Sequence, residues 1–125
     1  MKLFSVEEAN ALLPTVRRIV GAIQRAHARL ISYQDAAKYA AEGAELGGGG
    51  MTDGPRYVTL LIELSTKTAE LESLGVQLKD YARGLIDFPS MRDGRVVLLC
   101  WQLGEGNELE WWHDLDTGFA GRQPL

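Results

Sequence analysis

The strongest constraint on the fold is a stripe of apolar and small residues that recurs in steps of three and four. Such a period places the stripe on one side of an α-helix and is typical of a helix packed lengthwise against another. Most charged and amide side chains of this segment fall off the stripe, so the pattern predicts a long helix with one buried face. The stripe consists of Ala9, Leu12, Val16, Ile19, Ile23, Ala26, Leu30, Tyr33, Ala37 and Ala40.

Local signals place the start of this helix. Ser5 and Glu8 have the spacing of a capping box, in which the two side chains satisfy backbone N–H groups of the first turn. Pro14 has no backbone N–H to donate and crowds the turn before it. We therefore expect a short helix to Leu12 or Leu13, followed by a restart with Pro14 at the first position.

A second helix is expected after a glycine-rich stretch. Residues 42–54 hold six glycines, whose backbone freedom makes regular structure costly, and they predict a flexible tip. Pro55 suits a helix start, a helical stripe continues to Leu78, and Gly84 is a stop that allows a left-handed cap. The sequence thus predicts a long antiparallel two-helix hairpin over about residues 5–83.

Beyond residue 85 the period changes from helical to extended. Residues 96–103 and 109–113 are strand candidates around a turn at 104–107, and residues 92–95 offer a further turn. We expect a C-terminal β-hairpin and an irregular tail. The predicted fold is mainly α with a small β element (α+β), in one domain spanning residues 1–125.

Composition narrows the partners. The chain has 13 Lys+Arg against 17 Asp+Glu, so neither nucleic acid nor a membrane surface is an expected partner. No apolar run approaches the roughly 20 residues of a transmembrane helix, and the first residues lack the apolar core of a signal peptide. The single cysteine excludes an intrachain disulfide, which favours a reducing, cytoplasmic setting.

Cys100 and His113 are the pair of side chains best suited to bind a ligand or to react. They lie in a segment that also holds all three tryptophans. A two-residue loop between their strands, or a register shifted by two, puts both on one face, whereas an even-sum register separates them. A thiolate and an imidazole together can bind a divalent transition metal, and a closed zinc site needs four ligands. The nearest acidic candidates are Glu105 and Asp114, with Asp87, Asp116 and His27 as further alternatives.

The same pair invites two other interpretations. Cys100 and His113 could act as nucleophile and base, although no oxyanion donor or orienting group can be placed. Packing is the simpler interpretation, because an unpaired cysteine is often buried and tryptophans often cover a small core.

Several peptides carry a family resemblance: FSVEEAN at 4–10 with LLP at 12–14, LKD at 78–80, GLIDFP at 84–89, LCW at 99–101 with GE at 104–105, WH at 112–113 and GFAGR at 118–122. Together they resemble the bacterial family of domain of unknown function 2203 over nearly the whole chain. The resemblance implies a bacterial setting and supplies no mechanism.

Two function classes follow from these patterns. The favoured one is a noncatalytic interaction or assembly module, because the helical stripe is too long for the β segment to cover. It would self-associate as a homodimer through Val16, Ile19, Ile23 and Leu30. The alternative is a small metal-binding or thiol-redox protein that uses Cys100 and His113, and an enzyme is the less favoured class.

Overall fold

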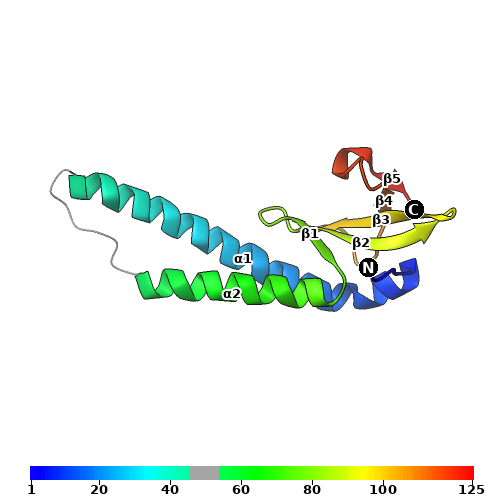
Figure 1. Cartoon of the computed structure of the whole chain (residues 1–125), viewed down its shortest axis with the longest axis horizontal. Helices are drawn as coiled ribbons and strands as arrows, with labels where there is room; N and C mark the ends of the chain where they lie inside the picture. Colours follow the sequence, from blue (N-terminus) through cyan, green and yellow to red (C-terminus); the bar gives the residue numbers. More distant parts are fainter. Residues whose placement is uncertain (46–53) are drawn as a thin grey trace.

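The computed structural model describes residues 1–45 and 54–125, which form two long helices followed by a five-stranded antiparallel sheet (Figure 1). The strand order follows the sequence, so each strand pairs with its neighbours along the chain. The α+β class is confirmed. The elements are α1 (Val6–Glu45), α2 (Gly54–Ser73), β1 (Gln77–Asp80), β2 (Leu85–Arg92), β3 (Arg95–Gln102), β4 (Trp111–His113), the 3-10 helix η1 (Phe119–Gly121) and β5 (Gln123–Pro124).

Helix α1 begins as predicted and continues further than predicted. The Ser5 N–H donates to Glu8 Oε1 at 3.2 Å and the Glu8 N–H to Ser5 Oγ at 3.0 Å, which completes the capping box. The expected break at Pro14 is wrong, because Pro14 lies inside the helix. Leu13 and Val16 on either side are buried. Burial of each side chain stabilises the fold by about 1.5 to 3 kcal/mol, which offsets the roughly 3 kcal/mol that an interior proline costs.

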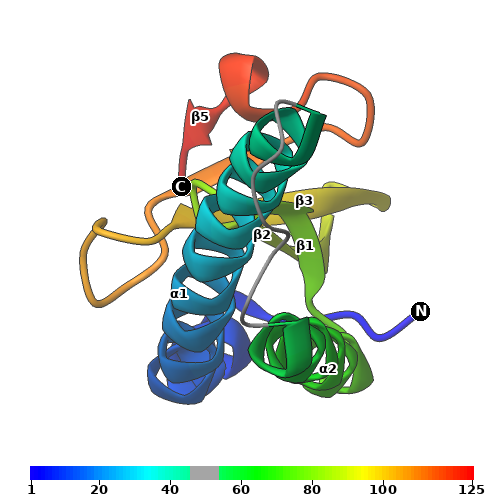
Figure 2. The same ribbon diagram turned by 90° about the vertical axis from the view of Figure 1, so that its left-hand side faces the viewer.

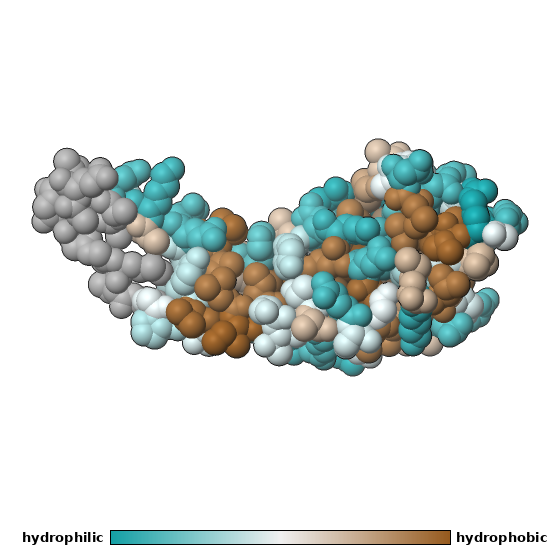
Figure 3. All heavy atoms as spheres, viewed as in Figure 1, coloured by the Kyte–Doolittle hydropathy of each residue, from teal (hydrophilic) through white to brown (hydrophobic). Residues whose placement is uncertain are grey.

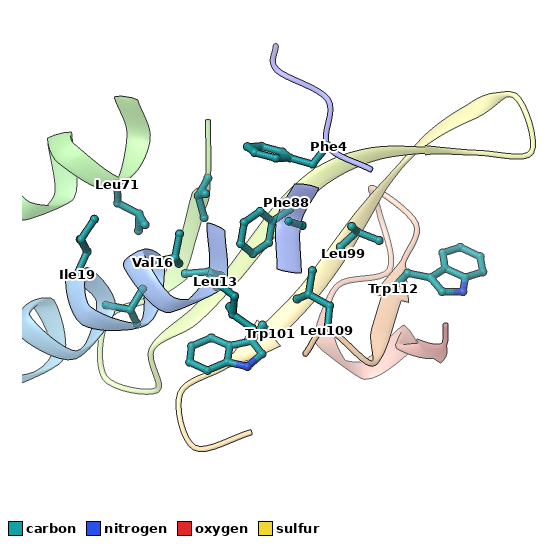
Figure 4. Close-up of a cluster of buried hydrophobic side chains, with 14 of the residues drawn as sticks. Phe4, Leu13, Val16, Ile19, Leu71, Phe88, Leu99, Trp101, Leu109 and Trp112 are labelled. Atoms are coloured by element: carbon teal, nitrogen blue, oxygen red, sulfur yellow. The ribbon is translucent and has the colours of Figure 1, made fainter. Parts of the chain in front are cut away.

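The buried face of α1 lies in the core of this same chain. Val16, Ile19, Ile23 and Leu30, which the sequence assigned to a dimer interface, are buried within the chain and are not available on its surface. That assignment is therefore corrected, since α2 and one face of the sheet cover much of this stripe. Figure 4 shows Leu13, Val16 and Ile19 of α1 in one cluster with Leu71 of α2 and Phe88, Leu99 and Trp101 of the sheet.

Helix α2 ends earlier than the sequence predicted. It stops at Ser73, and Gly75, at φ 91°, supplies the left-handed residue that was expected at Gly84. The segment around Leu78 is strand β1, with Leu78 packed against the core from a sheet edge. One apolar residue fits a helical or an extended period equally well, so the stripe could not mark this boundary.

Strands β2 and β3 form the longest pairing in the sheet, and β2 was not expected from the sequence. They join through a turn at Asp93 and Gly94, both with positive φ (51° and 77°), inside the stretch 92–95 recognised as a turn. Strands β3 and β4 correspond to the two strands of the expected hairpin. The predicted β-hairpin is thus part of a larger sheet.

The sheet is sandwiched between unlike layers. Figures 1 and 2 show the helices on one side of it and the C-terminal segment with η1 on the other, while the helical hairpin extends well beyond it. Of the expected tip, residues 42–45 belong to α1 and Gly54 begins α2. Residues 46–53 lie outside the described part, as does most of the tip prediction. No described helix is long and apolar enough to cross a membrane.

A substitution at Gly84 tests the packing of the β1–β2 turn, and one at Gly94, in the β2–β3 turn, is its control. A Cβ on Gly84 (φ 63°) would meet Leu103 Cβ at 2.7 Å and Val20 Cγ1 at 3.0 Å, whereas one on Gly94 (φ 77°) would meet nothing within 4 Å. Both alanine variants bear backbone strain of about 1 to 2 kcal/mol, and overlap adds about 1 to 3 kcal/mol for Gly84→Ala. Chemical denaturation should show the larger loss of unfolding free energy for Gly84→Ala. Equal losses would contradict the close approach of this turn to Val20 of α1 and to Leu103, the residue after β3.

Candidate metal site

Three neighbouring strands bring Asp87, Cys100 and His113 together on the sheet face turned away from the helices. Side chains alternate along a strand, so Asp87 and Cys100 point opposite to the core residues beside them in sequence. In the register, Asp87 lies directly across from Cys100, and Leu98 lies across from His113. Each of the three residues is buried, and one potential ligand atom from each lies within 4.8 Å of the other two.

The register explains why Cys100 and His113 share a face. The pairing of Leu98 with His113 is the one shifted by two from a two-residue turn, and it places His113 diagonally beside Cys100. The structure therefore selects one of the same-face alternatives that the sequence left open.

The two acidic residues favoured by sequence do not join this cluster. Glu105 forms an ion pair with Arg122 at 2.7 Å, and Asp114 forms one with Arg95 at 3.0 Å. Asp116 is exposed, and His27 stacks on Tyr81 with ring centroids 5.5 Å apart. Among these alternatives, Asp87 is the residue that the fold places beside Cys100 and His113.

The imidazole of His113 is oriented by the backbone. Its Nδ1 lies 2.7 Å from the carbonyl oxygen of Asp114, and a carbonyl only accepts, so Nδ1 carries a proton. Its Nε2 lies 3.0 Å from Asp87 Oδ1. If Nε2 is unprotonated, it and an ionised carboxylate are both acceptors, and a proton or a cation must lie between them.

Burial controls the ionisation of the two acids. It raises the pKa of Asp87 above its ordinary value, and the neighbouring His113 opposes this only partly. Burial and then the negative charge of Asp87 raise the pKa of the Cys100 thiol to about 12, against a smaller opposing effect of Arg122. A thiol held protonated is a poor nucleophile, so this arrangement argues against thiol catalysis by Cys100.

The comparisons with known proteins bear on this geometry only through the family. A family model described as "Uncharacterized conserved protein (DUF2203)" matches residues 2–125. The chain belongs to this family. Comparisons with curated proteins and with solved structures returned no match. Every residue of the candidate site lies within the matched part of this DUF2203 chain.

Asp87 carries a local signal in the sequence, although Glu105 and Asp114 were favoured over it as acidic ligands. It is a carboxylate inside the run Leu85-Ile86-Asp87-Phe88, where a buried strand would normally carry apolar side chains. A buried carboxylate requires a hydrogen-bonding or charged partner. Identifying that partner needed strand β2 and its register with β3, which the sequence did not predict.

The thiol should make the metal-free chain sensitive to alkali. With its pKa raised from 9.0 to about 12, Cys100 stays protonated in the folded state while the unfolded chain ionises. Its contribution to stability is complete below pH 9.0 and is lost as pH rises toward about 12. Denaturation of the unsubstituted chain across this window should show a decline steeper than that of Cys100→Ala by up to about 1.4 kcal/mol per pH unit.

The same burial predicts that a thiol reagent reacts slowly with the native chain and completely after unfolding. A buried, protonated Cys100 would be contradicted by two results together. The unfolding free energies of the unsubstituted chain and of Cys100→Ala would fall equally with pH, and the thiol would react at once in the native state.

Proposed function

We propose that this chain binds one divalent transition-metal ion through Asp87, Cys100 and His113. The main support is that three different donor atoms converge in a buried position, all within 4.8 Å of one another. The three residues lie on hydrogen-bonded neighbouring strands of the sheet, so the donors are in place before an ion binds. Pre-placed donors lower the ordering cost of binding.

The donor set indicates the class of ion. Thiolate and imidazole ligands suit Zn²⁺ and related transition metals, whereas Ca²⁺ and Mg²⁺ take oxygen ligands. With Asp87 and Cys100 ionised and His113 neutral, the two negative charges balance a divalent ion, which makes the site compatible with burial. A tetrahedral ion would take one further ligand such as water.

The environment of His113 supports the same proposal. Metal-bound histidines usually donate their second ring N–H to a carbonyl or carboxylate, which fixes the tautomer and leaves the other nitrogen to the metal. The contact between Nδ1 and the Asp114 carbonyl has this form. A reducing, cytoplasmic setting would keep the Cys100 thiol available as a ligand.

Elemental analysis of protein purified without an affinity tag tests this function. We expect about one zinc or related ion per chain, and its loss in Cys100→Ser and in His113→Ala, because two remaining ligands hold an ion poorly. Asp116→Asn is the matched control, since Asp116 is exposed, and it should retain the ion. Equal metal content in the unsubstituted chain and in Cys100→Ser, or none after incubation with zinc, would overturn the proposal.

A second candidate function is self-assembly, and an exposed apolar face of α2 favours it. Val58, Leu61 and Ile62 are 52%, 41% and 61% exposed. Their spacing places them on one side of the helix, and Figure 3 shows apolar surface over this part of α2. A homodimer pairing two α2 faces would cover these side chains, in place of the α1 residues that the fold buries.

Sedimentation distinguishes this surface from the core. Ile62→Asp should convert a dimer at tens of micromolar to a folded monomer, because a charge opposes burial of the face. Arg56→Asp, at an exposed position on another side of α2 from Val58, Leu61 and Ile62, is the control and should remain dimeric. Leu30→Asp should reduce the folding stability itself, since Leu30 is buried within the chain. A monomeric unsubstituted chain would rule out this candidate.

A further inference from the structure

Arg122 is held against the candidate metal site by several independent contacts. Its Nη1 and Nη2 donate to the two carboxylate oxygens of Glu105 at 3.2 and 2.7 Å. Its guanidinium carbon lies 4.7 Å from the ring centre of Trp111 and 4.4 Å from that of Phe119. Such a paired and stacked guanidinium has little freedom to turn.

The same guanidinium reaches the sulfur. Nη1 of Arg122 donates toward Cys100 Sγ at 4.0 Å, the long end of the range for a contact with sulfur. Glu105 is itself fixed, because its Oε1 accepts the backbone N–H of Gln102 at 2.6 Å. Gln102 of β3 thus holds Glu105, Glu105 holds Arg122, and these contacts direct one N–H of Arg122 toward Cys100.

The charges around this contact suit a metal-bound thiolate. The Glu105–Arg122 pair is neutral as a unit, so it brings a cationic N–H donor to the sulfur without adding net charge. A metal-bound thiolate is a strong acceptor for such a donor, and an N–H bond to its sulfur stabilises the charge. Salt-bridge formation alone would not require the guanidinium to face Cys100.

We propose that Arg122 is a positioning residue for the metal site: it donates an N–H to the Cys100 thiolate and holds the sulfur toward Asp87 and His113. This inference rests on the proposed metal binding and goes beyond it by assigning the group that tunes the thiolate ligand. Outer contacts of this kind typically change metal affinity by about 10- to 100-fold.

Cobalt titration tests the role, since Co²⁺ reports thiolate ligation through a sulfur-to-metal charge-transfer band. Arg122→Gln should weaken Co²⁺ and Zn²⁺ binding by about tenfold or more and move the band to longer wavelength, because loss of the N–H donor raises the energy of the sulfur electrons. Arg122→Lys, which retains a cationic donor, should recover part of the affinity. Arg83→Gln is the matched control, because the exposed Arg83 also stacks on Phe119, at 4.2 Å from the ring centre, and its side chain bonds Gln102 instead of a donor residue of the site.

Each outcome decides a different statement. An unchanged band and affinity in Arg122→Gln, or an equal loss in Arg83→Gln, would overturn the role of Arg122 while leaving metal binding intact. Absence of a cobalt band in the unsubstituted chain would overturn the metal proposal itself. Circular dichroism monitors folding. If Arg122→Gln does not fold, Glu105→Gln replaces it, with a smaller shift expected and an unchanged band overturning the role.

Discussion

The register of β2 against β3 is the constraint on which the rest of the structure depends. It directs Ile86, Phe88, Leu99 and Trp101 toward the helices, where they join the core. The same alternation directs Asp87 and Cys100 to the opposite face. A slip of one residue would exchange the two faces, burying a carboxylate in the core and exposing aromatic surface. The core and the candidate site are thus two consequences of one pairing.

The opposite face carries an unusual arrangement for a covered sheet surface. Asp87 and His113 are buried beside the thiol of Cys100. Burying polar groups is unfavourable unless they are paired, and the paired groups here extend outward through Asp114 to Arg95 and through Arg122 to Glu105. An apolar set would have covered this face at lower cost. A requirement for these donor atoms, as in the proposed metal site, would account for their presence.

The features that the sequence predicted depend on local signals. The capping box at Ser5 and the buried face of α1 arise from spacing within one helix, and the common face of Cys100 and His113 depends only on register parity. The missed features depend on contacts between different elements. Pro14 remains helical because the core covers both sides of it, and the significance of Asp87 arises from a strand pairing that its own neighbourhood cannot specify.

In the proposed site, one thiolate, one imidazole and one carboxylate meet at a single ion. X-ray absorption at the zinc edge of the zinc-loaded, untagged protein measures this most directly, because sulfur and the lighter ligands scatter differently. We expect one sulfur at about 2.3 Å with nitrogen and oxygen ligands at about 2.0 to 2.2 Å. A coordination shell of nitrogen and oxygen alone would place the ion away from Cys100 and contradict the proposed site.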